Sequence, residues 1–392
     1  MLRVIIFDMD GVMVDSEPQH GKAALEVLHR YGIEADMEYH EQFIGSSTKN
    51  MAKQVVEEHH LSVTPEQLLE ELNQAKRDIH RKEGYIPLPG IQEMIPLLTH
   101  AGFKLAIASS SSPHEIETAL KSISLKKYFN KLVSGTHAEH PKPAPDIYNM
   151  VLKEMGINPD EAIVVEDSEY GVAAAKAAGL PCIGYVNPHS GKQDLSQADV
   201  LLESFEGITP SFFQHIWQRS HGEPVTIANT RRLIIRELSV EDIPALYPIY
   251  QDPDVAKFID DIEDYKEKEI AKQEAYIRNV YSFYGYGLWG VFSKTTQGLI
   301  GRCGIENQVV DGKQEIMLSY LLDSNHWGFG YALECCKAVF EYAVKELHIH
   351  RIVAVIDKEN SRSIRTAENL GMKSERELTY KGRDSILYSI KL

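Results

Sequence analysis

The chain has 392 residues, with 57 acidic and 41 basic side chains and a formal net charge of −16 at pH 7. This length predicts two or three domains. The acidic excess argues against general binding to a nucleic-acid backbone and against a polybasic membrane anchor. The four cysteines lack Cys-x-x-Cys spacing, and the sequence shows no signal peptide and no long apolar run. We therefore expect a cytoplasmic protein that is not embedded in a membrane.

Short apolar runs alternate with helical segments over about the first 205 residues. The first run, 2–7, is typical of a buried strand, and helical periodicity follows from about 17 to 83. Further strands are expected at 103–108, 131–134, 162–165 and 181–186, with helices between them. This alternation predicts an α/β fold with a parallel sheet and helices on both faces. The helical block after the first strand predicts a cap over the C-terminal edge of that sheet.

Polar side chains follow several of these strands at the point where each strand ends. Asp8 and Asp10 come after the first strand, and Ser109 comes after the strand at 103–108. Lys142 lies between prolines, and Glu166 and Asp167 follow the strand at 162–165. Parallel strands bring their carboxyl ends to one edge, where α/β sheets bind ligands. A carboxylate can attack phosphorus if a metal neutralises the phosphate, and oxygen ligands suit Mg²⁺.

With these motifs, residues 1–205 resemble the haloacid dehalogenase superfamily, in particular its β-phosphoglucomutase-like phosphatases with a helical cap. The resemblance implies a Rossmann-like core at 1–15 and 88–205 and a cap at 16–87. It implies Asp8 as the nucleophile, Asp10 as the general acid and base, and Ser109 and Lys142 as the groups that hold the phosphoryl oxygens. Magnesium would then bind Asp8, the Asp10 carbonyl and Asp167, with Glu166 as a supporting ligand.

The cap is expected to select a small phosphorylated metabolite, through His20, Gly45, Thr48 and Lys76. In the mutases of this group, the position of His20 orients the acid/base aspartate, and a cap arginine three residues after a glycine grips a second phosphate. Here Thr48 stands in place of that arginine, and Ser112 replaces a core lysine. The loss of these cations favours a phosphatase acting on a sugar phosphate over a sugar phosphomutase, although Lys76 partly restores the positive charge.

A different pattern begins near residue 231. Segment 206–230 looks like a final helix and a linker, and 231–392 reads as an α+β domain. Its expected order is a strand at 232–237, helices at 239–250 and 264–280, strands near 287–293, 298–306 and 314–323, a helix at 330–347, a strand at 350–356, a helix at 360–370 and two final strands.

A glycine-rich turn lies between a strand and a helix of this second domain. It contains Gly328 and Gly330, followed by Tyr331 and Ala332. Such a turn lets backbone N–H groups approach an anion, and the helix dipole adds to the attraction. With these residues, and with Asn360 and Ser363 further on, 231–392 resembles the GNAT acetyltransferases, in particular those that acetylate ribosomal-protein N-termini. The resemblance implies a sheet splayed at its fourth strand, with the pyrophosphate of acetyl-CoA at 328–332 and with Asn360 and Ser363 beside the cofactor.

The acceptor of the acetyl group is expected to be an amine, either a small molecule or a protein N-terminus. Glu315, on the strand before the glycine turn, is the candidate base, with an exposed structural role as the alternative. The tyrosine that many family members use as an acid falls on Ala367. An alternative hypothesis is therefore a mutase whose second domain binds acyl-CoA and regulates it without catalysis.

Overall fold

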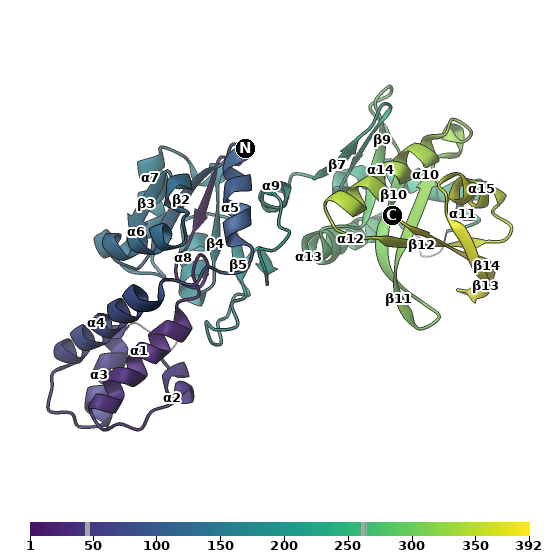
Figure 1. The fold of residues 1–392 in the computed structure, drawn as a ribbon. Helices are drawn as coiled ribbons and strands as arrows, with labels where there is room; N and C mark the ends of the chain where they lie inside the picture. The colour runs from purple at the N-terminus through teal and green to yellow at the C-terminus, as the bar shows by residue number, and fades with distance from the viewer. Residues whose placement is uncertain (44–47, 260–262, 264) are drawn as a thin grey trace. The chain divides into compact units, whose positions relative to one another are not determined.

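The computed structural model describes residues 1–43, 48–259, 263 and 265–392. The chain divides into two compact units, Met1–Ser220 and His221–Leu392, each with a sheet of its own (Figure 1). Among the described residues, no helix has the length and apolar character needed to cross a membrane.

The first unit is built on a six-stranded parallel sheet in the order β3-β2-β1-β4-β5-β6, which confirms the predicted core. Its strands are β1 (Val4–Phe7), β2 (Lys104–Ser109), β3 (Lys131–Ser134), β4 (Ala162–Glu166), β5 (Cys182–Tyr185) and β6 (Val200–Leu202). Successive side chains of β1 enter opposite apolar clusters, with Ile5 and Phe7 on one face and Val4 and Ile6 on the other. This alternation is the period of a strand that is covered on both faces.

Helices cover both faces of this sheet and form the cap. The core helices are α5 (Ile91–His100), α6 (Pro113–Ser122), α7 (Asp146–Met155), α8 (Glu169–Ala177) and α9 (Pro210–Ser220). The cap helices are α1 (Glu17–Arg30), α2 (Met37–Glu41), α3 (Thr48–Glu58) and α4 (Pro65–Glu83). The cap has an apolar cluster of its own, in which Val27 and Leu28 of α1 join Leu68 and Leu72 of α4.

Segment 206–230, expected to be largely a linker, is shared between the two units. Helix α9 places Phe213, Ile216 and Trp217 in the apolar core of the first unit. The Trp217 indole N–H also donates to the carbonyl of Asp160 at 2.9 Å. Strand β7 (Thr226–Asn229) then pairs with β8 of the second unit. The apolar side chains of this segment therefore bind it to the two cores.

The second unit contains an eight-stranded mixed sheet in the order β13-β14-β12-β11-β10-β9-β8-β7. After β7 come β8 (Leu233–Arg236), β9 (Leu288–Ser293), β10 (Leu299–Val310), β11 (Lys313–Leu322), β12 (Arg351–Asp357), β13 (Lys373–Tyr380) and β14 (Arg383–Lys391). Strands β11 and β12 run parallel, and their register is the single pair Met317 and Val353. The other neighbouring strands are antiparallel, with longer registers.

The helices of the second unit are α10 (Ile243–Gln251), α11 (Pro253–Ala256), α12 (Lys266–Tyr276), α13 (Ser282–Tyr284), α14 (Tyr331–Lys345) and α15 (Ser361–Asn369). Helix α14 packs its apolar side, including Val339 and Phe340, into the main cluster of this unit. Helix α10 packs Leu246 and Tyr250 into a separate cluster that includes Leu321 of β11. Helices α14 and α10 therefore pack against the sheet through two separate apolar clusters.

Candidate functional site

Lys142 joins two carboxylates at the C-terminal edge of the first sheet. Its Nζ donates to Asp8 Oδ1 at 2.6 Å and to Glu166 Oε1 at 2.5 Å. Asp8 is 6 % exposed and Glu166 is fully buried. Glu166 also accepts a hydrogen bond from Tyr148 Oη at 2.7 Å, and its second oxygen accepts from Ser168 Oγ at 3.1 Å. The oxygens of Glu166 are therefore used to fix Lys142 beside Asp8.

Two hydroxyl groups hold the carboxylate of Asp10. Ser16 Oγ donates to Oδ1 and Ser111 Oγ donates to Oδ2, both at 2.8 Å. Ser16 precedes the first cap helix, and Ser111 follows β2. Neither was identified from the sequence, where His20 was expected to orient this aspartate. In the structure, His20 Nδ1 instead lies 3.7 Å from the carboxylate of Glu17.

The buried carboxylates in this site outnumber its cation. Ligand oxygens of Asp8, Glu166 and Asp167 lie within 4.8 Å of one another. Burial is the main cause that raises the pKa of Asp8 to about 7, and it also raises the pKa of Asp167. Three buried carboxylates beside one lysine need further positive charge, and their hard oxygen donors fit Mg²⁺.

The backbone near Asp167 fits closely against its carboxylate. Gly11 has φ +79°, and a Cβ there would lie 1.9 Å from Asp167 Oδ2. Ser190 Oγ donates to the same Asp167 oxygen. Ser109 is buried at the end of β2, and its Oγ accepts from the N–H of Ser111 at 3.0 Å. The Ser109 hydroxyl proton therefore remains available for a phosphate oxygen.

The cap contributes a partly buried cation that lies near an acid. Lys76 Nζ donates to Thr48 Oγ1 at 3.0 Å, so the structure brings together two of the four residues predicted to bind substrate. Burial lowers the pKa of Lys76, while the charges of Glu17, Asp10 and Glu115 raise it. Gly45 lies outside the described residues.

Glu17 is the centre of a polar cluster inside the cap. His20 and His40 lie 3.7 and 3.8 Å from its carboxylate. Burial raises the pKa of Glu17, but these two histidines outweigh burial and hold that pKa well below its usual range. His40 is 6 % exposed. Glu17 thus stays ionised and balances the charge of Lys76.

On the core side of the cap, Ser112 has a structural role. It is the N-cap of α6, and its Oγ donates to Glu115 Oε2 at 2.6 Å. The substitution of a lysine by Ser112 therefore removes a cation and fixes an acidic side chain near the site. Glu115 was not identified from the sequence, where the capping box Ser-x-x-Glu was the available signal.

The second unit holds two adjoining cavities. One has a volume of about 370 Å³ and is lined by parts of β10, β11, β12 and α12. The other has a volume of about 730 Å³ and is lined by the glycine turn and by α15. The cavities share six lining residues: Phe258, Ile259, Tyr320, Leu321, Asn360 and Ser363. These six residues, which we call the junction, mark where a ligand in one cavity meets a ligand in the other.

The junction follows from the separation of β11 and β12. Beyond Met317 and Val353, residues 318–321 of β11 and 354–357 of β12 line the smaller cavity. Neighbouring parallel strands would normally pair along their length, so this separation opens a wedge whose backbone groups can bind an extended ligand. The predicted splaying at the fourth strand after residue 231 corresponds to β11.

The glycine turn has the conformation expected of an anion site. Gly328 and Gly330 have φ values of +83° and +78°, and Gly330 is the N-cap of α14. Arg232 supports the turn, because its Nη1 donates to the carbonyl of Phe329 at 2.9 Å and its Nε donates to Glu334 at 2.7 Å. Tyr331 and Ala332 also line the larger cavity.

The N-cap residue and two arginines of α15 complete the lining of the larger cavity. Arg362 stacks on the indole of Trp327, with 4.1 Å between the guanidinium carbon and the ring centroid. The side chain of Asn360 caps α15 by accepting from the N–H of Ser363 at 3.1 Å. Arg362 and Arg365 line the larger cavity and were not identified from the sequence. Both cations suit a ligand that carries phosphate groups.

The structure does not support Glu315 as the base. Among the described residues, it lines neither cavity, and Arg351 Nη2 and Nε each lie 3.3 Å from its carboxylate oxygens. Glu315 lies opposite Gln308, towards the hairpin turn and before the point where β11 leaves β12. Glu306 does line the smaller cavity, and its Oε1 accepts from Tyr276 Oη at 2.7 Å.

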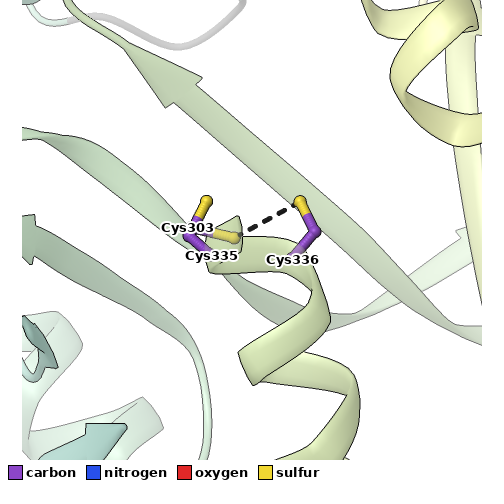
Figure 2. A group of neighbouring side chains, drawn as sticks. All are labelled: Cys303, Cys335 and Cys336. Atoms are coloured by element: carbon purple, nitrogen blue, oxygen red, sulfur yellow. Dashed lines mark hydrogen bonds between the residues drawn. The ribbon is translucent and has the colours of Figure 1, made fainter. Parts of the chain in front are cut away.

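Three thiols of β10 and α14 lie close together (Figure 2). Sγ of Cys303 on β10 lies 3.7 Å from Sγ of Cys336 on α14, and Cys335 completes the group. All three residues are fully buried in the main apolar cluster of the unit. Burial raises the pKa values of Cys303 and Cys336, whereas hydrogen bonds from these two thiols lower the pKa of Cys335 to about 5. The group is part of the apolar core of this unit.

Comparisons with known proteins match each of the two units. Residues 5–185 match the haloacid dehalogenase-like hydrolase family, and residues 232–373 match the GNAT acetyltransferase domain. Fructose-1-phosphate phosphatase YqaB of Escherichia coli is 33 % identical over 179 residues, which are 46 % of this chain and 94 % of YqaB. A phosphorylated carbohydrates phosphatase of Thermotoga maritima is 31 % identical over 203 residues, which are 52 % of this chain and 91 % of that protein.

Among solved structures, CbbY of Rhodobacter sphaeroides in complex with phosphate is 25 % identical, with a TM-score of 0.49, and covers 55 % of this chain and 100 % of its own. The sequence matches are the stronger finding, since each spans a complete catalytic unit. The chain belongs to the haloacid dehalogenase-like hydrolases through its first unit, and its second unit is similar to the GNAT acetyltransferase domain.

Proposed function

We propose that the chain is a bifunctional enzyme, which hydrolyses a monophosphate ester of a small carbohydrate in its first unit and acetylates an amine in its second. The observation that supports the first activity best is the bridge from Lys142 to Asp8 and Glu166. It places a buried carboxylate nucleophile beside a fixed cation, at the edge of the sheet where substrates of this fold class bind.

In the proposed hydrolysis, an Asp8 oxygen attacks phosphorus and the bond from phosphorus to the leaving oxygen breaks. Ser109 and Lys142 hold the phosphoryl oxygens, and Asp10 gives its proton to the leaving oxygen. Asp10 then takes a proton from the water that attacks the aspartyl-phosphate, which restores Asp8. Ser16 and Ser111 keep the Asp10 carboxylate aimed during both proton transfers.

The acidic residues of this site fit magnesium. Asp8, Asp167 and the Asp10 carbonyl would hold it, while Glu166, whose oxygens accept from Lys142, Tyr148 and Ser168, would position Lys142. When bound, the ion neutralises charge on the phosphate.

The charges in the cap support a monophosphate with a polar, uncharged body. Lys76 is matched by Glu17, and Glu115 adds a further acid on the core side. A second phosphate would meet this pair without a free cation to bind it. Hydroxyl groups could instead bond to Lys76, Thr48 and the Glu17 cluster. The two carbohydrate phosphatases that match this unit agree in substrate class.

The test of the first activity is phosphate release across ketose and aldose monophosphates, with phosphoglycolate and a nucleotide monophosphate as smaller and larger comparisons. We expect hydrolysis of one or more sugar monophosphates and of no bisphosphate. Incubation with a hexose 1-phosphate and a bisphosphate primer separates the alternatives. A hexose 6-phosphate product would establish the mutase, and release of free sugar would establish the phosphatase.

The adjoining cavities support acetyl transfer in the second unit. Acetyl-CoA fits the larger cavity, with its pyrophosphate at the glycine turn and Arg362 and Arg365 as further cations. When bound, it supplies an activated acetyl group. The amine would occupy the smaller cavity, where Glu306 removes its proton and Tyr276 orients Glu306. Glu306 replaces Glu315 in this role.

The test of the second activity is the release of free thiol from acetyl-CoA in the presence of small amines and of peptides with free N-termini. Acetylated product detected by mass spectrometry would establish the transfer. If the full-length protein binds acetyl-CoA, acetylates none of these amines, and changes its phosphatase rate on binding, then the second unit is a regulator.

A further inference from the structure

Arg302 is a cation of the smaller cavity that the fold leaves without an anion. It lies on β10, is half-buried, and among the described residues lines the smaller cavity but not the larger one. Its guanidinium carbon lies over the ring of Tyr250, 5.0 Å from the ring centroid. Within the part of the chain that the structure describes, Arg302 forms no ion pair and no hydrogen bond. A partly buried arginine without such a partner requires an explanation.

The neighbouring charges in this cavity are already engaged. Lys272 lies 3.7 Å from the carboxylate of Glu269. Glu306 accepts a hydrogen bond from the Tyr276 hydroxyl at 2.7 Å. Neither glutamate forms an ion pair with Arg302 in the described chain, although all three residues line the same cavity. The cavity therefore presents an unpaired positive charge in addition to the proposed base.

The charges of this cavity act on one tyrosine. Tyr250 is 3 % exposed, and burial is the main cause that raises the pKa of its hydroxyl. The charge of Arg302 opposes that rise in pKa, whereas the carboxylates of Glu269 and Glu306 add to it. Charges of both signs therefore lie around a single side chain, so a small ligand in this cavity can meet Arg302 and Glu306 at the same time.

Strand β10 sets the spacing between Arg302 and Glu306. The two residues lie four positions apart, so their side chains leave the same face of the strand, with Cα atoms about 13 Å apart. Arg302 pairs with Leu321, a member of the junction, and Glu306 pairs with Met317, where β11 also pairs with β12. The space between the two side chains thus borders the wedge, and the cavity volume of about 370 Å³ suits a small acceptor.

We propose that Arg302 binds a carboxylate of the acceptor, and that the acceptor is a small amine carrying a carboxylate, of which a free amino acid is the simplest case. This inference rests on the proposed acetyl transfer and names the class of its acceptor. Arg302 and Glu306 together match the two ends of a zwitterion. A guanidinium group can bind a carboxylate through two parallel hydrogen bonds.

Two other kinds of acceptor fit this cavity less well. A phosphate dianion would add two negative charges beside Glu269 and Glu306. The N-terminus of a peptide has an amide in place of the carboxylate, so it would cover Arg302 without supplying an anion. In the transfer itself, the amine nitrogen bonds to the acetyl carbon, the carbon–sulfur bond breaks, and the sulfur keeps the electron pair. Glu306 takes the proton that the nitrogen loses, and the carboxylate stays bound to Arg302 throughout.

The test offers acetyl-CoA and each of the common amino acids to the full-length protein, and then compares the best acceptor with its own carboxamide. We expect kcat/KM of the wild type to be about 100-fold higher for the free acid than for the amide. Because this comparison needs no variant, it holds whether or not a variant folds. A wild type that acetylates the amide as well as the acid would overturn the proposal.

Substitution of Arg302 sharpens the comparison. Arg302→Met keeps an apolar stem over Tyr250 and removes the charge, so kcat/KM for the free acid should fall about 100-fold while that for the amide stays within about threefold. Arg302→Lys keeps the charge without the planar fork and should lie between the two. Arg376→Met, an exposed arginine of β13 outside the lining of both cavities, is the control. Equal losses for acid and amide in Arg302→Met would mean that Arg302 only supports the structure.

The two failures can be told apart. If the wild type acetylates no amino acid, no other small amine and no peptide, the proposed acetyl transfer fails. If the wild type acetylates peptides or amines without a carboxylate, and does so in preference to free amino acids, the assignment of Arg302 fails while acetyl transfer stands.

Discussion

The two candidate sites are organised in opposite ways. In the first unit, Asp8, Asp10 and Glu166 are each held by a hydrogen bond of 2.8 Å or less from another side chain. In the second unit, the glycine turn lines the larger cavity, and the Tyr320 hydroxyl is buried without a partner among the described residues. One site is assembled in advance, and the other leaves bonds for its ligands to complete.

The difference follows from the source of the reacting atoms. In the proposed reactions, the first unit supplies its own nucleophile, so its carboxylates must be fixed and their charges balanced before a substrate arrives. The second unit would bring two external molecules together, so its residues would bind and orient them. We therefore expect a single substitution to abolish the activity of the first unit. Single substitutions in the second unit should each reduce its activity only in part.

The largest expected effect is that of Asp8→Asn on phosphate release. An amide cannot form the aspartyl-phosphate, so we expect a loss of at least about 1000-fold in kcat. Asp194→Asn, an exposed carboxylate of the same unit, should retain full activity. Acetyl transfer should be unchanged in both variants. Phosphatase activity in Asp8→Asn within tenfold of the wild type would remove Asp8 from the role of nucleophile.

The next effect separates two glutamates of one hairpin. Glu306→Gln should lower the kcat of acetyl transfer by about 100-fold, a typical contribution of a general base. Glu315→Gln should leave kcat within about twofold, because Glu315 is bound to Arg351 and lines neither cavity among the described residues. If Glu315→Gln abolishes acetyl transfer and Glu306→Gln keeps the wild-type rate, then Glu315 is the general base. Steady-state kinetics at saturating acetyl-CoA makes the measurement.

These glutamates also show what sequence patterns can and cannot locate. Asp8 and Ser109 were predictable because parallel strands deliver their C-terminal residues to one edge, whatever the details of packing, whereas Lys142 reaches that edge from a loop beyond β3. Glu315 was placed on the correct strand. Its distance from the wedge depends on where β11 leaves β12, and this is set by the pairing of Met317 with Val353, for which the local sequence carries no signal.

The hydrogen-bond partners of hydroxyl groups were also not predictable from the sequence. Ser16 and Ser111 bond to one aspartate from segments about 95 residues apart, and serine has no spacing that marks such convergence. Tyr320 was hidden for a related reason, since its unmet hydrogen bond exists only in the folded protein. Charges and glycines are visible in sequence because their chemistry is local, whereas the partners of neutral polar groups are decided by tertiary structure.

A smaller effect is expected from the glycine turn. Gly330→Ala and Gly312→Ala both place a Cβ at a positive φ, +78° and +75°, so each should lose about 1–2 kcal/mol of folding stability. Gly330→Ala should in addition weaken acetyl-CoA binding by about tenfold or more, because the turn that faces the pyrophosphate must shift. Gly312 lies in the hairpin between β10 and β11, away from both cavities, and calorimetry should show unchanged binding. Equal binding by the two variants would mean that the turn does not hold the anion.

The smallest effect concerns the pH response of the cap. His80 stacks on Tyr85 with 4.0 Å between ring centroids, and burial, with help from the nearby His20, lowers its pKa to about 4, although the charges of Asp10 and Glu115 oppose this. In the unfolded chain a histidine takes up a proton near pH 6.5. Between pH 6.5 and 4 the unfolded chain therefore binds more protons, and the stability of the cap should fall as pH falls.

Hydrogen-exchange protection of α4 should accordingly decrease more steeply from pH 6.5 to pH 5 in the wild type than in His80→Gln. His114→Gln, an exposed histidine at the start of α6, should follow the wild type. If His80→Gln keeps the full wild-type slope, His80 is not the group whose protonation weakens the cap.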